Sequence, residues 1–448
     1  MKKQLCTVFF TVFMLLISCE NQIQTECSDA TVKMRAYAYL KEWYLWYEHI
    51  PLIDPTSYDS LADMMNAVKY REGDKLIDRF SYVASKAEHD GYYAGKRYGM
   101  GLSWMRNDAN ELYISMVYPG SPAGDAGLRR GQKMLAMNGV TVEELDENGE
   151  YNKQHRNDAG FEEKTDWNNV YNAENKGEEV KFLVLDEGQE LETTVVLDDY
   201  TAKSVLASKV LESGGVKTGY LHLKSFINSS EDELNEAFAI FKEENVEQLV
   251  LDLRYNGGGL VKIAEQLVNL VAGSKGKDQD IIKIIYNNKH SEKNVDYKGK
   301  KLKNSLENVK KVAFIVSSGT ASASEMVLNS LTPFFDVVIV GETTYGKPVG
   351  MNALDICEET IVPITFKYAN AEDYGDFFLG IDPDCQASDD FMHDFGDERE
   401  GELAAALYYF ANGKCSAEAA ARKTAKRRRI EELIPRELKG MGKIDYTF

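Results

Sequence analysis

From about residue 201 onward, short apolar segments alternate with longer amphipathic ones, and this alternation limits the possible folds more than any other feature of the chain. Strands are expected at 217–226, 248–253, 312–316 and 337–340, and helices at 230–245, 260–271 and 322–331. Apolar strands that alternate with helices are typical of a largely parallel sheet that helices cover. The sequence therefore predicts an α/β core over residues 201–415, in which Ser230 and Glu233 form a capping box at a helix start.

The rest of the chain leaves room for further domains, since 448 residues exceed a typical single domain about threefold. Residues 28–95 carry aromatic side chains near helical spacing and predict a small N-terminal helical domain. Residues 97–199 contain short strand-like runs between glycine, proline and asparagine turns and predict a β-rich domain. Its polar stretch at 146–166 is expected to be a surface insertion. The tail 416–448 carries no motif that indicates a role.

The first residues indicate export from the cytoplasm. Lys2 and Lys3 precede a mainly apolar run of 13 residues, which is too short to span a bilayer and predicts a signal peptide over residues 1–18. The segment at the end of this run, Leu16-Ile17-Ser18-Cys19, resembles the lipobox of bacterial lipoproteins, in which the cysteine carries the lipid. The alternative is a chance thiol beside a conventional cleavage site. On the lipoprotein interpretation, Cys19 anchors the protein in the cell envelope, facing the periplasm or at the outer-membrane surface.

Charge and cysteine content exclude several classes of protein. The formal net charge of −20 repels phosphate backbones, so a general nucleic-acid binder is not expected. Six cysteines are too few for a disulfide scaffold, and no CxxC or HExxH motif indicates a metal site. Outside the cytoplasm, disulfides can form, but the sequence leaves the pairing open among four cysteines: Cys27, Cys357, Cys385 and Cys415.

A glycine-rich turn follows one of the expected core strands, and ligands of open α/β sheets gather at the carboxyl ends of strands. The segment is Asp252-Leu253-Arg254-Tyr255-Asn256-Gly257-Gly258-Gly259. Three consecutive glycines expose backbone N–H groups that a ligand oxygen can approach closely. A flexible turn that serves packing alone is the alternative.

A second junction, from Val316 to Glu325, places Ser322 where a strand turns into a helix. The Ser322 hydroxyl would lie at the positive end of the helix dipole, and Ala321 and Ala323 leave room for a substrate, which suits a nucleophile. Ser322 and Glu325 also have the spacing of a capping box, so a purely structural cap is the alternative.

A third junction, from Gly341 to Pro348, carries Lys347 among small residues that would let its side chain point inward. A serine hydroxyl is a poor nucleophile at neutral pH and needs a base. Lysine can be that base only if burial lowers its pKa from about 10.4 toward neutrality. An exposed loop charge is the alternative for Lys347.

Together the three junctions resemble those of the C-terminal processing, or tail-specific, serine peptidases. The resemblance rests on Gly319-Thr320-Ala321-Ser322-Ala323-Ser324-Glu325, on Gly346-Lys347 and on the run from Leu251 to Gly259. It implies a crotonase-like α/β catalytic core with a Ser-Lys dyad. In that dyad Ser322, rather than Ser317, Ser318 or Ser324, is the nucleophile, and Lys347 is the general base. The resemblance also implies oxyanion-hole donors at Ala323 and within the glycine turn, most plausibly at Gly258.

One position departs from the pattern of that family. Many members carry a glutamine four residues after the lysine, where this chain has Met351 with Asn352 beside it. The departure leaves open which group orients Lys347.

The expected β-rich domain carries its own resemblance. The segments Tyr98-Gly99-Met100-Gly101-Leu102, Pro119 to Gln132 and Met137-Asn138-Gly139-Val140 resemble a PDZ domain of the bacterial protease type. Successive backbone N–H groups of Met100, Gly101 and Leu102 would then receive the terminal carboxylate of a peptide that adds a strand to the sheet. A module that only regulates the core or packs against it is the alternative. Farther upstream, Asp78-Arg79-Phe80-Ser81-Tyr82 resembles the segment that closes the N-terminal helical domain in lipoprotein members of the family.

The sequence as a whole predicts a lipid-anchored serine endopeptidase of extracytoplasmic polypeptides that requires no metal or organic cofactor and leaves the oligomeric state open. The first alternative is a non-catalytic peptide-binding lipoprotein with a degenerate core, which Met351 and the capping-box spacing favour. A second alternative is an acyl-CoA enzyme of the crotonase superfamily, which would need neither a PDZ-like module nor an anchor.

Overall fold

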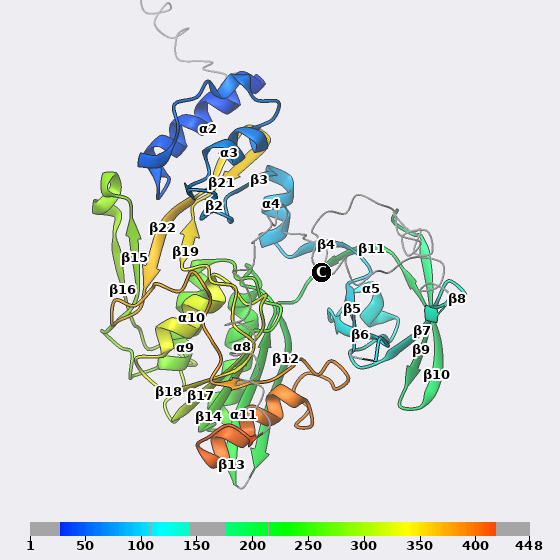
Figure 1. Cartoon of the computed structure of the whole chain (residues 1–448). Helices are drawn as coiled ribbons and strands as arrows, with labels where there is room; N and C mark the ends of the chain where they lie inside the picture. The colour runs from blue at the N-terminus through cyan, green and yellow to red at the C-terminus, as the bar shows by residue number, and fades with distance from the viewer. Residues whose placement is uncertain (1–26, 108, 144–174, 214, 418–448) are drawn as a thin grey trace, which may run out of the picture.

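The computed structural model describes residues 27–107, 109–143, 175–213 and 215–417 (Figure 1). The predicted signal peptide, the Cys19 lipidation site and the 146–166 insertion lie outside the described residues, as does the tail from 418 onward. Among the described helices, none has the length and apolar character that a membrane crossing requires.

The core is built on a six-stranded sheet in the order β12-β13-β14-β17-β18-β23. Its strands are β12 (Val205–Ser213), β13 (Val216–Leu223), β14 (Gln248–Asp252), β17 (Lys311–Val316), β18 (Asp336–Gly341) and β23 (Cys385–Gln386). From β13 to β23 all pairs are parallel, and only β12 pairs antiparallel. The α/β fold class expected from the alternation of strands and helices is confirmed.

Helices cover both faces of this sheet because successive strand residues point to opposite sides. One apolar cluster joins Leu249, Leu251 and Phe314 to the helices α8 (Ser230–Glu243), α9 (Val261–Ala272) and α10 (Ala323–Leu331). The other cluster joins Val250 and Ala313 to α11 (Gly401–Asn412). The central strands are therefore buried on both faces, which explains their continuous apolar sequence.

The start of α8 differs from the prediction. The expected capping box of Ser230 and Glu233 is wrong: the N-cap residue is Ser229, without a side-chain hydrogen bond. The Ser230 hydroxyl instead donates to the Ser225 carbonyl at 3.1 Å. The Glu233 carboxylate accepts the N–H groups of Ser204 and Val205 at 2.8 and 2.7 Å. The Glu233 carboxylate has thus taken tertiary partners in place of the local one.

The N-terminal domain consists of helices and short strands that pack on the core. Its elements are α2 (Asp29–Trp43), η1 (Tyr47–His49), η2 (Pro55–Ser57), α3 (Leu61–Val68), β1 (Arg71–Glu72), β2 (Lys75–Leu76), β3 (Tyr82–Ser85) and α4 (Lys86–Tyr93). Strand β3 pairs with β21 (Glu359–Val362), which in turn pairs with β20 (Leu354–Ile356). The domain shares one apolar cluster with Val349, Ile361 and Ile364, so it is continuous with the core.

A second core sheet, in the order β16-β15-β22-β19, lies between the main sheet and the N-terminal domain (Figure 1). Its strands are β15 (Asp280–Tyr286), β16 (Val295–Lys298), β19 (Val349–Met351) and β22 (Ile364–Ala369), and η4 (Asn288–Lys293) connects β15 to β16.

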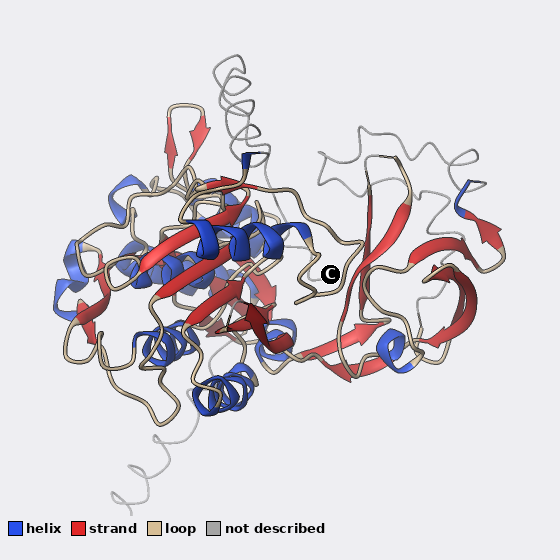
Figure 2. Cartoon of the chain, turned by 90° about the horizontal axis from the view of Figure 1, so that it is seen from below, coloured by secondary structure: helices blue, strands red, loops and turns tan. Residues whose placement is uncertain are grey.

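The β-rich domain lies beside the core (Figures 1 and 2). Its sheet runs β10-β9-β7-β6-β5, with β8 on β7 and the short helix α5 (Pro122–Asp125). The strands are β5 (Leu102–Arg106), β6 (Leu112–Val117), β7 (Lys133–Met137), β8 (Val140–Thr141), β9 (Glu179–Asp186) and β10 (Gln189–Val196). The entering β4 (Lys96–Gly99) pairs with the leaving β11 (Asp198–Thr201), so this two-stranded ribbon forms the connection to the rest of the chain.

Two disulfides answer the pairing question that the sequence left open. Cys27 is bonded to Cys357, and Cys385 to Cys415. The first ties the start of α2 to the β20–β21 hairpin, and the second ties the edge strand β23 to the end of α11.

Candidate active site

The three predicted junctions lie at one edge of the main sheet. Strands β14, β17 and β18 are adjacent and parallel, so their carboxyl ends meet. The glycine turn follows β14, the Ser322 loop follows β17 and the Lys347 loop follows β18. The topology therefore brings together segments that are far apart in the sequence, at the edge where α/β sheets bind ligands.

The glycine turn lies directly against Ser322. A Cβ atom on Gly258, whose φ is +104°, would lie 2.7 Å from Ser322 Cβ and 2.9 Å from Ala323 N. Gly259, with φ +140°, would place a Cβ 2.1 Å from the Phe226 carbonyl oxygen. No side chain fits at either position, so glycine is required here both for the backbone conformation and for the close approach.

Ser322 is the N-cap residue of α10 but has an unusual backbone. Its φ of 56° and ψ of −117° differ from the extended conformation of ordinary N-cap serines. The expected capping box with Glu325 is present, and in it the Ser322 N–H donates to Glu325 Oε2 at 2.9 Å. The other contact of the box places the Ser322 side chain at the Glu325 N–H. Such backbone strain in a non-glycine residue is concentrated at functional sites.

The buried Glu325 carboxylate connects the serine and lysine loops. Its Oε2 accepts the N–H groups of both Ser322 and Lys347, at 2.9 and 2.8 Å. Its Oε1 accepts the Gly346 N–H at 2.7 Å and the Thr344 hydroxyl at 2.5 Å. Burial raises the pKa of Glu325, while these four hydrogen bonds oppose the rise. Since all four partners donate, the environment suits the ionised carboxylate, which is an acceptor only.

Tyr368 on β22 makes a second connection between the two loops. Its buried hydroxyl lies 3.0 Å from the Ser322 carbonyl oxygen and 2.8 Å from the Lys347 carbonyl oxygen. Sequence reasoning missed this residue, because nothing in an alternating strand sequence distinguishes a tyrosine of this kind from an ordinary core aromatic.

The Lys347 amine lies in an apolar environment. It approaches Met351 Sδ at 3.6 Å and the ring centre of Phe80 at 5.4 Å. Burial lowers the pKa of Lys347 to about 8, although the negative charges of Asp78 and Glu325 act in the opposite direction. The amine makes no hydrogen bond to the Ser322 hydroxyl within the described part of the chain. Catalytic hydrogen bonds are often long in structures without substrate and tighten when it binds.

The two expected oxyanion donors differ in availability. Ala323 is the first residue of α10, and its N–H has no partner among the described residues. The Gly258 N–H, in contrast, donates to Asn256 Oδ1 at 2.9 Å, so in this structure it is not free for a substrate oxygen.

The predicted carboxylate-binding loop of the β-rich domain is anchored by its carbonyl groups. The Met100 carbonyl accepts the Ala123 N–H and the Gly101 carbonyl accepts the Tyr118 N–H, both at 2.9 Å. Leu102 then begins β5. Gly101 has φ +78°, and a Cβ there would lie 2.2 Å from Ser121 Cβ. The tight packing holds the loop in one conformation.

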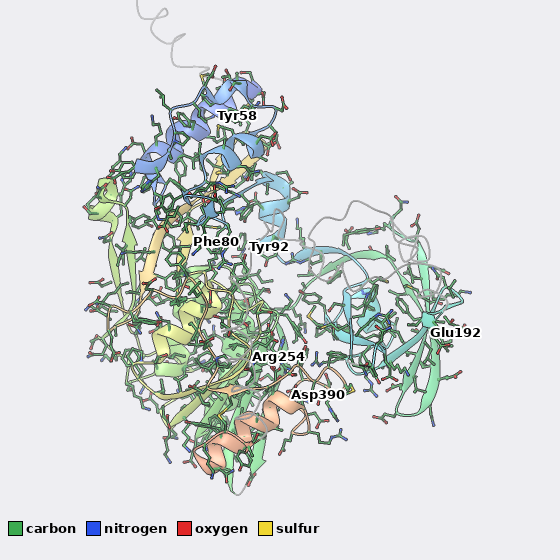
Figure 3. All side chains as sticks on the ribbon, viewed as in Figure 1. Tyr58, Phe80, Tyr92, Glu192, Arg254 and Asp390 are labelled. Atoms are coloured by element: carbon green, nitrogen blue, oxygen red, sulfur yellow. A yellow bond between two sulfur atoms is a disulfide. The ribbon has the colours of Figure 1, made fainter. Side chains whose placement is uncertain are left out.

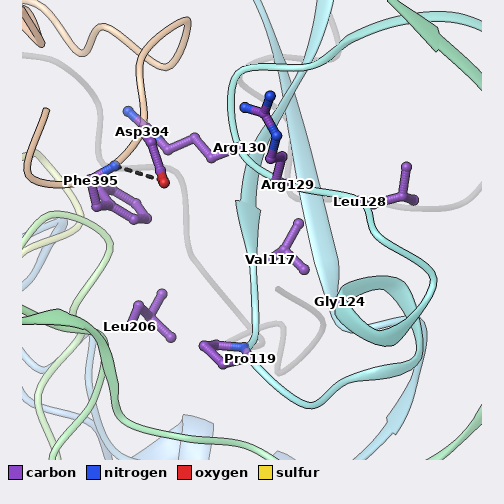
Figure 4. A pocket seen from close by; sticks show the side chains of 9 residues that line it. All are labelled: Val117, Pro119, Gly124, Leu128, Arg129, Arg130, Leu206, Asp394 and Phe395. Atoms are coloured by element: carbon purple, nitrogen blue, oxygen red, sulfur yellow. Dashed lines mark hydrogen bonds between the residues drawn. The ribbon is translucent and has the colours of Figure 1, made fainter. Parts of the chain in front are cut away.

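An interface that the sequence did not predict connects the β-rich domain to the glycine turn. Arg130 is 2% exposed and donates to Asp389 Oδ1 at 2.9 Å and to the Tyr255 hydroxyl at 3.1 Å. Asp389 also pairs with the buried Arg254, 3.0 Å away. Beside this cluster, Figure 4 shows a pocket between the two domains, lined by Val117, Pro119, Gly124, Leu128, Arg129, Arg130, Leu206, Asp394 and Phe395.

Three carboxylates near this interface, those of Asp389, Glu400 and Glu402, lie close enough together to suggest a cation site. Arg254 occupies their centre, with its Nη1 atom 2.8 Å from Glu400 Oε1 and 2.6 Å from Glu402 Oε2. The guanidinium is thus the cation that these carboxylates hold, and they form a structural charge cluster.

We predict that Glu325→Gln lowers the free energy of unfolding by about 2–4 kcal/mol, because an amide NH₂ group would face two backbone donors and leave them unsatisfied. Denaturant unfolding followed by circular dichroism measures the change. Glu342→Gln is the matched control, since among the described residues the Glu342 carboxylate accepts a single long hydrogen bond, of 3.4 Å from the Ser318 N–H. Equal stability of the two variants would refute the connecting role of Glu325.

Comparison with known proteins identifies the family. The profile of peptidase family S41 matches residues 217–387, that of the peptidase S41 N-terminal domain residues 32–82, and that of the PDZ domain residues 93–150. The chloroplastic C-terminal processing peptidase of Tetradesmus obliquus is 25% identical over 372 residues, which cover 80% of this chain and 73% of that protein. The carboxy-terminal processing protease CtpA of Bacillus subtilis is 26% identical over 291 residues, which cover 64% of this chain and 56% of that protein.

The carboxyl-terminal-processing protease of Picosynechococcus is 26% identical over 294 residues, which cover 65% of this chain and 64% of that protein. The fold agrees with the solved structure of a Bacteroides fragilis protein assigned to the S41 proteases, at a TM-score of 0.69 and 24% identity, over 84% of this chain and 96% of that one. The chain belongs to peptidase family S41, a family of serine peptidases that includes the carboxyl-terminal-processing proteases, and carries the N-terminal domain of that family together with a PDZ domain.

Proposed function

We propose that this protein is a serine endopeptidase that hydrolyses extracytoplasmic polypeptides through Ser322 and Lys347. The observation that carries the proposal is the double connection between these residues. Glu325 binds the backbone N–H groups of both, and the Tyr368 hydroxyl lies within hydrogen-bond distance of the carbonyl oxygens of both. A serine with a strained backbone, a lysine with a lowered pKa and a glycine turn are thus held at one sheet edge.

In the proposed reaction, the Ser322 hydroxyl attacks the peptide carbonyl carbon while the neutral Lys347 amine accepts its proton. The amine must leave Met351 and approach Ser322 when substrate binds. The Ala323 N–H holds the oxyanion of the tetrahedral intermediate. A second donor comes from the glycine turn, from Gly258 if its N–H leaves Asn256.

Collapse of this intermediate breaks the peptide C–N bond, and the protonated Lys347 donates its proton to the leaving amine. The product is an ester between Ser322 and the acyl part of the substrate. Water, deprotonated by Lys347, then attacks this ester and releases the carboxylic acid together with free Ser322.

Replacing either residue of the dyad should abolish cleavage. We expect kcat to fall by about 100-fold or more in Ser322→Ala and in Lys347→Met, because each removes a group that takes part in bond formation or proton transfer. Cleavage of an unstructured polypeptide, followed by mass spectrometry, measures the loss. Ser318→Ala, at an exposed position of the same loop, is the matched control. Full activity of both dyad variants would show that the dyad is misassigned.

The pKa of Lys347 predicts how activity changes with pH. Only the neutral amine accepts a proton, so kcat/KM should rise about tenfold per pH unit below pH 8 and level off above it. A pH–rate profile between pH 6 and 10 measures this limb. A profile that is flat across the range, or one that falls as the pH rises, would contradict the role of Lys347 as base.

We further propose that the PDZ domain binds substrate C-termini through the N–H groups of Met100, Gly101 and Leu102. A hydrogen bond to a charged group contributes about 1.5–3 kcal/mol, so amidation of the peptide C-terminus should weaken binding at least about tenfold. Calorimetry with the Ser322→Ala variant measures binding without cleavage. An internal Glu-to-Gln change in the same peptide is the control for charge. Equal affinity of the acid and amide peptides would exclude carboxylate recognition.

The extracytoplasmic location is also a proposal, with Cys19 as the site of the lipid anchor. Its support is chemical: the disulfides Cys27–Cys357 and Cys385–Cys415 suit an oxidising compartment. If Cys19 carries the anchor, Cys19→Ser should move the protein from the membrane fraction to the soluble fraction. An unchanged distribution would refute the anchor.

A further inference from the structure

The segment that ends the N-terminal domain, Asp78 to Tyr82, has no part in the reaction described above, yet it packs against the loop that carries Lys347. Figure 3 shows Phe80 where the N-terminal domain meets the core. Phe80 is 6% exposed, and its ring centre lies 5.4 Å from Lys347 Nζ and 5.9 Å from the ring of Tyr345. An aromatic side chain from another domain thus lies beside the amine.

Two charged residues hold Phe80 in this position. The buried Asp78 carboxylate accepts the N–H groups of Phe80 and Ser81 at 3.1 and 2.9 Å and the Tyr44 hydroxyl at 2.5 Å. The guanidinium of Arg79 lies 5.0 Å from the Phe80 ring centre and 4.4 Å from that of Tyr345.

Arg79 also binds the lysine loop itself. Its Nη2 atom donates to the carbonyl oxygens of Tyr345 and Gly346, at 2.9 and 3.1 Å, and to that of Phe378 at 3.2 Å. Because Gly346 directly precedes Lys347, this contact fixes the loop relative to the N-terminal domain. Asp78 thus holds the backbone at Phe80, and Arg79 holds the loop that carries Lys347, so the ring and the amine stay next to each other.

We propose that Phe80 is a positioning residue for the proposed reaction, which covers the Lys347 amine and keeps water away from it. The inference rests on the proposed function, in which Lys347 must be neutral to accept the serine proton. It assigns to the N-terminal domain a direct part in preparing the catalytic base.

Phe80 has two opposing effects on the pKa of the Lys347 amine, and the larger of the two sets the direction of the shift. An ammonium group over an aromatic ring is stabilised by about 0.5–2 kcal/mol within about 6 Å, and the separation here is near that limit. Complete burial destabilises the ammonium form by more, since it lowers lysine pKa values by up to about 3–5 units, and Phe80 is part of the wall that buries this amine. The exclusion of water therefore dominates.

The other groups around the amine leave this conclusion unchanged. The charges of Asp78 and Glu325 favour the ammonium form. The neighbours Met351 and Tyr368 are neutral. Met351 covers the amine from within the core at 3.6 Å, and Phe80 supplies the apolar surface on the side of the N-terminal domain.

The decisive experiment titrates Lys347 directly in the full chain. With Ser322→Ala as the parent, ¹³Cε-labelled lysine is followed by NMR against pH, and Lys347→Met assigns the signal. We expect a midpoint near pH 8 in the parent and a rise of about one pH unit or more in Phe80→Ala, because water reaches the amine. Phe80→Leu, which keeps an apolar cover, should stay close to the parent. If Phe80→Ala does not fold, the smaller truncation Phe80→Val should show the same direction.

Met64→Ala is the matched control, since Met64 is fully buried in the same apolar cluster and its removal leaves a cavity in the same domain. Its midpoint should equal that of the parent. An unchanged or lower midpoint in the truncated Phe80 variants, or an equal rise in Met64→Ala, would overturn the inference.

The titration also separates this inference from the proposed function, because it does not depend on turnover. A wild-type protein that cleaves no polypeptide would refute the proposed function, and the NMR midpoints would still decide the role of Phe80. Conversely, suppose that cleavage depends on Ser322 and Lys347, but that the Lys347 titration midpoint is the same in the parent and in the Phe80 variants. That result would refute this inference and leave the proposed function standing.

Discussion

The Glu325 carboxylate is the interaction on which the rest of the site depends. A buried carboxylate has a high desolvation cost and remains ionised only where donors surround it. Here four donors do so, one from the N-cap residue of α10 and three from the loop between β18 and β19. The same four bonds fix the backbone of the serine loop relative to that of the lysine loop. A group that a helix start needs for capping therefore also sets the geometry between the two proposed catalytic residues.

The site is completed by segments of all three domains. The core supplies the serine, the lysine and the glycine turn. The N-terminal domain adds Phe80 and Arg79 to the wall around the lysine loop. The PDZ domain reaches the start of the glycine turn through Arg130 and the Tyr255 hydroxyl. These contacts are part-buried, and they join each domain to the core near the site.

Much of this arrangement could be predicted from the sequence, because it depends on local patterns. The strands and helices of the core appear where apolar periodicity placed them, and the glycine, serine and lysine junctions lie together because parallel strands end at one edge. The capping-box spacing of Ser322 and Glu325 is confirmed, since Glu325 binds the Ser322 N–H, while the role of Ser322 as nucleophile stays a prediction. The same reasoning was wrong for Ser230 and Glu233: Ser230 binds the Ser225 carbonyl just upstream of its helix, and Glu233 binds the segment that leads into β12.

The sequence by itself determined the fold class, the order of the domains and the residue types at the three junctions, since these follow from periodicity, turn chemistry and spacing along the chain. Only the tertiary structure decided the cysteine pairing, the joint binding of two loops by Glu325 and Tyr368, the Met351 contact of the lysine amine and the cover that Phe80 places over it. The physical reason is that each of these contacts joins residues through space, and its strength depends on burial and distance, which no local pattern records.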